Sequence, residues 1–577
     1  MKNHWRELIS KPRYAVSEEK DIMVPMRDGV RLAADVFRPD AKGRFPALLA
    51  IGPWGKEAVE MPFPPQPLFK SAVWDGNLEC GDTSEIVPRG YAHIVVDARG
   101  TGNSEGVSYG GMTQKDGEDG YDLVEWIASQ PWCDGNIGMT GYSYYGGIQL
   151  KTAIQQPPHL KAIFPSHLVA DYYRDQGCAG GVVGLFGYGI FDGRGGTSGW
   201  APRNVRSQMM DALPQNEFER RRKALLANPD IRYYPNLYHL LNYPYKNPPF
   251  FDILMNPLDG PYWQERSSYP WYDKIKVPTH IIGKTARESS YLDVYSGIDC
   301  PKKILVKPNG PEERPWREDI ELIIRWYDHW LKGNDTGIMN EPPIKLFVMG
   351  INRYRLETEW PLPETEWMKC YLRRWEGLSF EPELYQDEPD CYLQQPLHLS
   401  NKRDSVVYTS APLPEPLEVI GEASFNFFAA IDQDDTNWIV RLADVAPGGA
   451  VVGLAGGQLK ASHRALDPDK TTALRPYHKH SSIDPVNPGE ITEYSIHLGL
   501  VSNVFLPGHR IRLSIGSMVS PRDPEIQIHY HPVLCSSRTT LHKIYRNREH
   551  RSHLLLPVIS KKQSVIDFLS DENNPGG

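Results

Sequence analysis

The stretch 137–147 constrains the fold more than any other feature of this sequence, and it reads Ile-Gly-Met-Thr-Gly-Tyr-Ser-Tyr-Tyr-Gly-Gly. It predicts a short strand, a tight turn at Ser143 and then a helix. Small residues before and after the serine give the two elements room to approach each other, as a nucleophile elbow requires. The pattern is G-x-S-x-x-G, because Tyr145 stands where the common G-x-S-x-G has its second glycine. A serine between glycines can also form an ordinary turn. The segments before and after it must therefore show whether this turn is a nucleophile elbow.

The segments before this turn alternate between predicted strands and helices. Apolar runs at 45–51 and 92–96 end in Gly-rich loops, which is typical of strands buried on both faces of a parallel sheet. Apolar positions at three-residue spacing and acids near the start predict a helix over 117–129. Residues 22–32 form two alternating runs joined by Asp28-Gly29, which predicts an antiparallel hairpin. The predicted fold class is therefore α/β.

Later segments complete the sheet around an insertion. After a predicted strand at 160–165 the chain becomes Gly- and aromatic-rich, with helical periodicity only in patches, which indicates an inserted cap. From about residue 363 onward, short alternating strands recur between Pro and Gly turns, and this is typical of a β-sandwich of the jelly-roll kind. The predicted domains are a core over 1–166 and 271–362, a helical cap over 167–270 and a jelly roll over 363–577.

Composition limits the kinds of partner that the chain can bind. Its 577 residues exceed what one core holds, and the net charge of −9 includes no long acidic or basic run that would suit nucleic acid or an anionic membrane. We find no leader-like apolar segment over residues 1–20 and no membrane-span window. Seven separated cysteines without a C-x-x-C pair fit reduced thiols. We expect a cytoplasmic protein that binds a small-molecule substrate without cofactor or metal; a homodimer is allowed but not required.

Three motifs give the chain a family resemblance. Residues 97–106 read Asp-Ala-Arg-Gly-Thr-Gly-Asn-Ser-Glu-Gly, residues 130–132 read Gln-Pro-Trp, and the turn reads Gly-Tyr-Ser-Tyr-Tyr-Gly. The sequence thereby resembles the cocaine-esterase and X-prolyl dipeptidyl-peptidase family of serine hydrolases. The resemblance continues through 325–333, 441–445, 507–513 and 553–557. It implies an α/β-hydrolase core with an inserted helical cap, a C-terminal jelly roll, and Ser143 as the elbow serine.

The same resemblance indicates where the groups that activate the serine should lie. Serine is a poor nucleophile at neutral pH and needs a base that a carboxylate orients. The family's acid lies about nine residues after a Val-Pro pair, here Val277-Pro278, and that position is Arg287, with Glu288 as the nearest carboxylate. The family's histidine lies in the loop after the next strand, but residues 305–312 contain none, and Pro311 takes its place. We therefore predict an incomplete triad.

Other residues could supply the missing functions. The family's oxyanion tyrosine aligns with Trp54, whose indole N–H can donate one hydrogen bond, and the Tyr144 amide is a second donor. His167 follows the strand after the nucleophile helix and is a candidate replacement base. The alternative is an imidazole that lines the pocket and bonds to nearby backbone. Tyr142, beside the serine, is assigned to substrate binding.

Loops and cap add candidates for the binding wall. Cations on loops expected at the carboxyl edge of the sheet could hold a carboxylate or enolate, although solvated loop cations are the alternative: Lys56, Lys284, Arg287 and Lys307. Aromatic residues between glycines could build a cavity over the serine or an ordinary cap core: Tyr172, Tyr173, Phe186, Tyr188, Phe191 and Trp200.

Three functions remain open from the sequence. The leading hypothesis is a hydrolase-family enzyme of secondary metabolism that acts on a small apolar acyl-bearing or polyketide-like molecule without hydrolysis, by cyclisation, isomerisation or elimination. Hydrogen bonds from Trp54, Ser143 and the Tyr144 amide would then stabilise charge on a carbonyl. The second is a serine ester or amide hydrolase or acyltransferase, with Ser143 as nucleophile, His167 as base and Glu288 orienting it. The third is a non-enzymatic binding protein.

Overall fold

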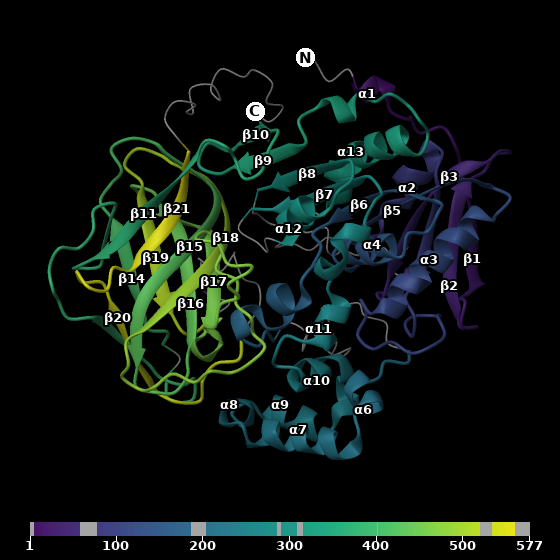
Figure 1. The fold of residues 1–577 in the computed structure, drawn as a ribbon. Coiled ribbons are helices and arrows are strands. Elements are labelled where there is room, and N and C mark those ends of the chain that lie inside the picture. The colour runs from purple at the N-terminus through teal and green to yellow at the C-terminus, as the bar shows by residue number, and fades with distance from the viewer. Residues whose placement is uncertain are drawn as a thin grey trace.

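The computed structural model describes residues 5–57, 78–185, 203–285, 290–308, 315–400, 402–519 and 533–559. In Figure 1 the ten-stranded core sheet lies to the right, a second sheet to the left, and a group of helices below. Two large apolar clusters fill the core on the two faces of its sheet, a third fills the second sheet, and a fourth fills the helical group. Each predicted unit therefore has its own core.

The core sheet has the strand order β1-β2-β4-β3-β5-β6-β7-β8-β9-β10. Neighbours from β4 to β9 in this order pair in parallel, whereas β1–β2, β2–β4 and β9–β10 pair antiparallel. The strands are β1 Val16–Pro25, β2 Arg31–Pro39, β3 Phe45–Gly52, β4 Ala92–Asp97, β5 Cys133–Tyr142, β6 Leu160–Ser166, β7 Thr279–Lys284, β8 Lys302–Lys307, β9 Ile344–Val348 and β10 Arg353–Glu357. This is the α/β-hydrolase arrangement, so the predicted fold class is confirmed.

Helices cover both faces of this sheet, as parallel strands buried on both sides require. One face packs against α3 Gln114–Ala128, α4 Tyr144–Ile154 and α12 Ser290–Gly297, and the other against α2 Thr83–Ile86 and α13 Pro315–Trp330; α1 is Trp5–Leu8. Helix α3 begins three residues before the predicted start at 117. The reason is a capping box, in which Thr113 and Asp116 exchange side-chain and backbone hydrogen bonds.

Short helices fill the stretch between β6 and β7. They are η5 Tyr172–Gly177, η6 Ala179–Gly181, α6 Gln208–Ala212, α7 Gln215–Ala227, α8 Pro229–Arg232, α9 Pro235–Asn242, η7 Pro244–Lys246, α10 Pro248–Met255, α11 Pro261–Arg266 and η8 Tyr269–Lys274. Proline occupies the first turn of many of them, where its missing N–H costs nothing. The helical cap that the sequence predicts is therefore present as an insertion into the sheet.

The C-terminal sheet has the order β13-β20-β15-β21-β11-β12-β14-β19-β16-β17, with β18 paired to β15. Its strands are β11 Thr365–Arg373, β12 Gly377–Ser379, β13 Asp390–Gln394, β14 Ser405–Ser410, β15 Leu417–Ile431, β16 Asn437–Val445, β17 Val451–Lys460, β18 Thr492–Phe505, β19 Arg510–Gly516, β20 Thr540–Tyr545 and β21 His553–Ile559. The short helix η10 Ala461–His463 follows β17, whereas η9 Ile338–Asn340 lies between α13 and β9 of the core. The C-terminal sheet curls around one apolar core as the predicted jelly roll.

Backbone contacts join the three units. Just after β9, Met349 forms a parallel bridge with Asn503 of β18, and its N–H donates to Ser502 O at 2.9 Å. On the cap side, a side chain at Gly180 would collide with the Gln458 carbonyl of β17. The jelly roll is therefore packed directly on both the core sheet and the cap.

Candidate active site

Ser143 lies on the strand–turn–helix that the sequence predicts. It is the single residue between β5 and α4, and its backbone has φ 59° and ψ −116°. A Cβ at Gly141 would collide with the side chain of Tyr145, and one at Gly146 would lie 2.6 Å from Ser166 O. The glycines around the serine are thus needed for the strand and helix to meet. The Ser143 hydroxyl makes no capping hydrogen bond to the first turn of α4.

Tyr145 replaces the second glycine of the common motif, and a glycine on another strand compensates. A side chain at Gly52, the last residue of β3, would overlap the Tyr145 ring. The ring belongs to a small apolar cluster with Phe37, Cys80 and Val95, and Trp54 packs against that cluster. The unusual tyrosine therefore anchors the loop that carries the predicted oxyanion donor Trp54 beside the elbow.

His167 lies next to Ser143 at the end of the neighbouring strand. Tyr142 pairs with Ser166, and the N–H of Ser143 donates to Ser166 O at 3.0 Å, so the two strands end together. The His167 N–H donates to Ile282 O of β7 at 2.8 Å, and its backbone has φ 48°. Two non-glycine residues with left-handed backbone therefore stand side by side. Such strain persists only where the surroundings impose it, and it clusters at active sites.

Tyr142 does not occupy the substrate-facing place that the sequence suggests. Its side chain is buried in the apolar layer between the sheet and α13. Its ring stacks on His167, with centroids 4.4 Å apart and planes inclined by 33°. Strand alternation explains the difference, because the residue before the serine turns its side chain into the sheet face. The Tyr142 ring therefore contacts the ring of His167, the candidate base.

Lys56 was predicted to bind an anionic substrate, and the structure corrects this. Its ammonium lies 2.8 Å from an Asp21 oxygen, 3.0 Å from Asp35 and 3.0 Å from Glu57. The lysine is 3% exposed, and the three carboxylates raise its pKa despite burial. Asp21 and Asp35 come from β1 and β2, which sequence spacing could not place beside residue 56. Lys56 therefore fixes the Trp54 loop to the sheet.

Asp97 is a positioning residue that the sequence analysis missed. Its carboxylate accepts the N–H of Lys56 at 2.7 Å and the N–H of Asn103 at 2.8 Å. Burial raises its pKa to about 6. The motif 97–106 contained the signal, since an acid ahead of Gly-rich backbone is suited to accept loop amides. Asp97 thus ties together the loops after β3 and β4 at the edge that holds Ser143.

The ends of β7 and β8 are also fixed by side-chain contacts. The Lys307 ammonium lies 2.9 Å from Asp319 of α13, and the Lys284 carbonyl accepts the Tyr291 hydroxyl of α12. Lys284 is 7% exposed. Lys56 and Lys307 are therefore paired with carboxylates, and Lys284 is buried at the end of β7. Arg287 and Glu288, like Pro311, lie outside the described residues.

The predicted cap aromatics divide between two places. Tyr172 OH lies 3.7 Å from where a Cβ of Gly147 would be, which puts it over the first turn of α4. Tyr173 is buried in the cap core, and its hydroxyl donates to Pro257 O at 2.9 Å. Phe186, Tyr188, Phe191 and Trp200 lie outside the described residues. Of the described pair, only Tyr172 is close to the elbow helix.

The described residues were also compared with the requirements of a metal site, a disulfide and a membrane-spanning helix. No cluster of three or more His, Cys, Asp or Glu suited to a metal ion occurs in the described part of the chain. All seven cysteines are described, and none of them forms a disulfide. No helix in the ranges that the structure describes has the length and apolar character needed to cross a bilayer.

Comparison with known proteins agrees with this geometry. Residues 28–308 match the family of X-Pro dipeptidyl-peptidase (S15 family), and residues 336–555 match the X-Pro dipeptidyl-peptidase C-terminal non-catalytic domain. Residues 28–308 therefore form a domain of the S15 family. Membership makes it an enzyme of the α/β-hydrolase type, consistent with the elbow at Ser143, and leaves its reaction class open.

Full-length relatives share the whole domain plan of this S15 protein. It is 28% identical to cocaine esterase of Rhodococcus sp. (strain MB1 Bresler), over 94% of this chain and 99% of the relative. A CocE/NonD family hydrolase from Staphylococcus aureus has a TM-score of 0.74 at 21% identity, covering 94% of this chain and 93% of that one. An alpha-amino acid ester hydrolase has a TM-score of 0.72 at 17% identity, covering 95% and 97%. The two solved structures show the fold alone.

Proposed function

We propose that this S15 protein is a serine ester or amide hydrolase in which Ser143 attacks an acyl carbonyl and His167 takes the serine proton. The observation that carries the proposal is the pair of left-handed residues at the ends of β5 and β6, with φ 59° at Ser143 and 48° at His167. Folding tolerates one such residue in a turn, but two side by side at a carboxyl edge favour a catalytic pair.

The chemistry would follow the usual serine route. The Ser143 oxygen bonds to the acyl carbon while His167 accepts its proton, and the leaving group departs with that proton. Water then attacks the acyl-enzyme, and His167 accepts and returns a proton in the same way. The Tyr144 amide at the start of α4 and the indole N–H of Trp54 would stabilise the oxyanion, with help from the positive end of the helix. The substrate class is a small acyl compound with an apolar part that contacts Tyr172.

A second candidate is the non-hydrolytic reaction predicted first from the sequence. It is favoured because, within the residues that the structure describes, no side chain is hydrogen-bonded to the Ser143 hydroxyl. In that case Ser143 would donate a hydrogen bond to a carbonyl and would not attack it. Cyclisation, isomerisation or elimination of an apolar acyl-bearing molecule would be the reaction class.

Covalent labelling distinguishes the two candidates. A fluorophosphonate should add one equivalent to the wild type and none to Ser143→Ala, with p-nitrophenyl butyrate as the test substrate for turnover. His167→Asn should slow labelling and turnover by about 10³-fold, the usual size of a general-base contribution. Asparagine is the matched replacement because it tolerates the left-handed backbone of residue 167.

Each outcome has a distinct reading. Labelling at an unchanged rate in a folded His167→Asn variant would retain Ser143 as nucleophile and reject His167 as its base. Failure of the wild type to label, in a protein that still converts an acyl-bearing substrate without hydrolysis, would reject the serine hydrolase and favour the second candidate.

A further inference from the structure

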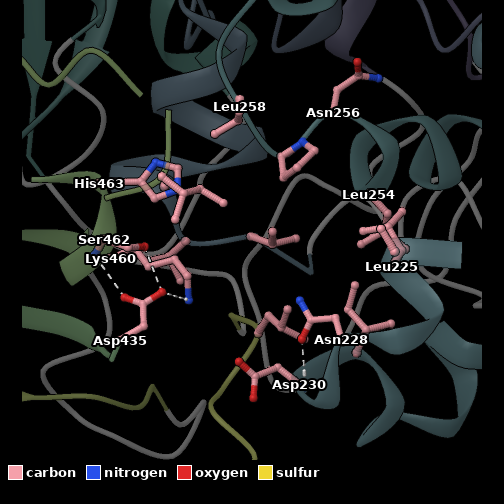
Figure 2. A pocket seen from close by; sticks show the side chains of 18 of the residues that line it. Leu225, Asn228, Asp230, Leu254, Asn256, Leu258, Asp435, Lys460, Ser462 and His463 are labelled. Carbon is pink, nitrogen blue, oxygen red and sulfur yellow. Dashed lines mark hydrogen bonds and ion pairs between the residues drawn. The ribbon is translucent and has the colours of Figure 1, made fainter. Parts of the chain in front are cut away.

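A cavity lies between the cap and the jelly roll, and Ser143, His167 and Trp54 are not among the residues that line it (Figure 2). Its volume is about 1000 Å³. One wall comes from the cap, along α7, α8 and the segment after α10, and the other from the jelly roll, around residues 434–437 and 460–463. This volume is at the upper end for sites that enclose a drug-sized molecule.

The cap wall is apolar. Figure 2 shows Leu225 and Leu254 on this side, and Leu258 reaches over the cavity from above. Ile231 and Met255 are buried behind the same surface. An apolar wall of this extent would stabilise a hydrocarbon body by removing it from water.

The charged side chains in the wall already have partners. Four are cationic and four are carboxylates. Arg220 and Arg221 pair with Glu217, Lys460 with Asp435 at 3.1 Å, Arg538 with Asp434 at 2.7 Å, and Asp259 with Arg174 at 2.7 Å. Asp230 accepts the N–H and hydroxyl of Ser537. An anionic ligand would have to displace a carboxylate from one of the four cations, so the cavity suits an uncharged molecule better than an anion.

His463 is a buried polar group of the wall, and one of its ring nitrogens can bind a ligand. It is 3% exposed, and its Nδ1 lies 3.2 Å from Nδ1 of His480, so one of the two nitrogens carries the hydrogen. Its other ring nitrogen, Nε2, has no hydrogen-bond partner among the described residues. Burial lowers the pKa of His463 to about 4, so the ring is neutral at pH 7. Depending on which histidine carries the shared hydrogen, Nε2 is a donor or an acceptor.

We propose that this cavity is a second ligand site, for an uncharged apolar molecule with a hydroxyl head, whose hydroxyl bonds to His463 and whose body lies against the cap wall. A hydroxyl matches His463 in either tautomer, because it can both donate and accept. A ligand there contacts cap and jelly roll together. Its binding therefore stabilises their packing and makes the melting temperature of the chain depend on ligand concentration.

Fluorescence titration of the full chain with 2-naphthol tests the proposal. We expect one equivalent to bind, the anion 2-naphthoate to bind at least tenfold more weakly, and Ala224→Trp, which fills the cavity from α7, to weaken naphthol binding at least tenfold. Lys223→Trp is the matched control, since the neighbouring residue is exposed and does not line the cavity. Ser143→Ala should bind naphthol unchanged, so failure of the function proposed above leaves this test intact.

His463→Phe tests the hydrogen bond separately. This variant keeps a flat ring against Gly181 and removes both nitrogens, and it should bind naphthol no better than naphthalene, whereas the wild type prefers naphthol. Equal naphthol binding by Ala224→Trp and the wild type, or binding of naphthoate as tight as that of naphthol, would overturn the proposal. Ala224→Trp keeps it falsifiable if His463→Phe fails to fold.

Discussion

The carboxyl ends of β5 and β6 differ from those of β3 and β8 in what holds them in place. At β5 and β6 the contacts are uncharged: glycines let the backbone close around Ser143, and His167 stacks on Tyr142. At β3 and β8 the contacts are ionic: Lys56 lies among three carboxylates and Lys307 pairs with Asp319. The edge lysines are thus part of the scaffold, while the strained serine and histidine are the groups that this scaffold presents.

The largest expected effect tests the ionic side of this comparison. Lys56→Met leaves Asp35, which is 2% exposed, without its cation, and should lower the free energy of unfolding by about 4 kcal/mol. Urea unfolding measures it, with the exposed Lys42→Met as the control. A raised KM with unchanged stability would contradict the scaffold role and restore Lys56 to the substrate site.

The next effect tests the uncharged side. A Cβ at Gly146 would lie 2.6 Å from Ser166 O, so Gly146→Ala should cost about 2 kcal/mol of stability. Gly147→Ala is the matched control on the same helix, because the nearest atom to its Cβ would be the flexible end of Met112, at 3.0 Å. Thermal unfolding of the two variants should therefore diverge. Equal melting temperatures would show that the elbow is looser than the close contacts indicate.

A smaller loss is expected at β8. Lys307→Met removes the cation from a largely buried pair and should cost about 2 kcal/mol, and Lys307→Met/Asp319→Leu should recover part of it, because the carboxylate is then removed together with its cation. Chemical denaturation of both variants measures the difference. A double variant as unstable as the single one would contradict the ion-pair explanation.

The smallest effect is a pH dependence at Lys151 of α4. Burial lowers its pKa to about 7, and its ammonium donates to Ser267 O at 3.0 Å, at the end of the cap. The unfolded chain binds this proton more tightly, so the wild type should gain stability over Lys151→Met as pH rises, by at most about 1.4 kcal/mol between pH 7 and pH 8. Unfolding at several pH values tests this. A constant difference would mean that the lysine titrates normally.

Local patterns in the sequence predicted the fold well, and the reason is physical. Buried parallel strands are continuous apolar runs, so β3, β4 and β6 were predicted to within one residue at each end. The hairpin at Asp28-Gly29 is likewise observed, with Val24 opposite Leu32. The start of α3 was predicted three residues late, because its cap depends on a side-chain contact and not on periodicity, and β1 begins at Val16, six residues before the predicted run.

The site was harder to predict because the roles of its side chains depend on contacts with residues that are distant in the sequence. The role of Lys56 depends on carboxylates of β1 and β2, and Tyr145 fits only because Gly52 of β3 leaves room for its ring. Neither relation can be deduced from spacing around residue 56 or 145. The elbow itself was predictable, since strand, turn, serine and glycines are contiguous. The assignments of Arg287 and Glu288 remain predictions.

The bridge between Met349 and Asn503 affects how the chain is made. Met349 lies at the edge of the core sheet, yet its backbone partners, Ser502 and Val504, are synthesised about 150 residues later. At ordinary elongation rates of about 5–20 residues per second, that edge waits on the order of ten seconds for its neighbour. During this interval the backbone N–H and C=O of Met349, at the end of β9, are open to other nascent chains. A ribosome-bound truncation ending near residue 480 should therefore aggregate more readily than one that includes β18.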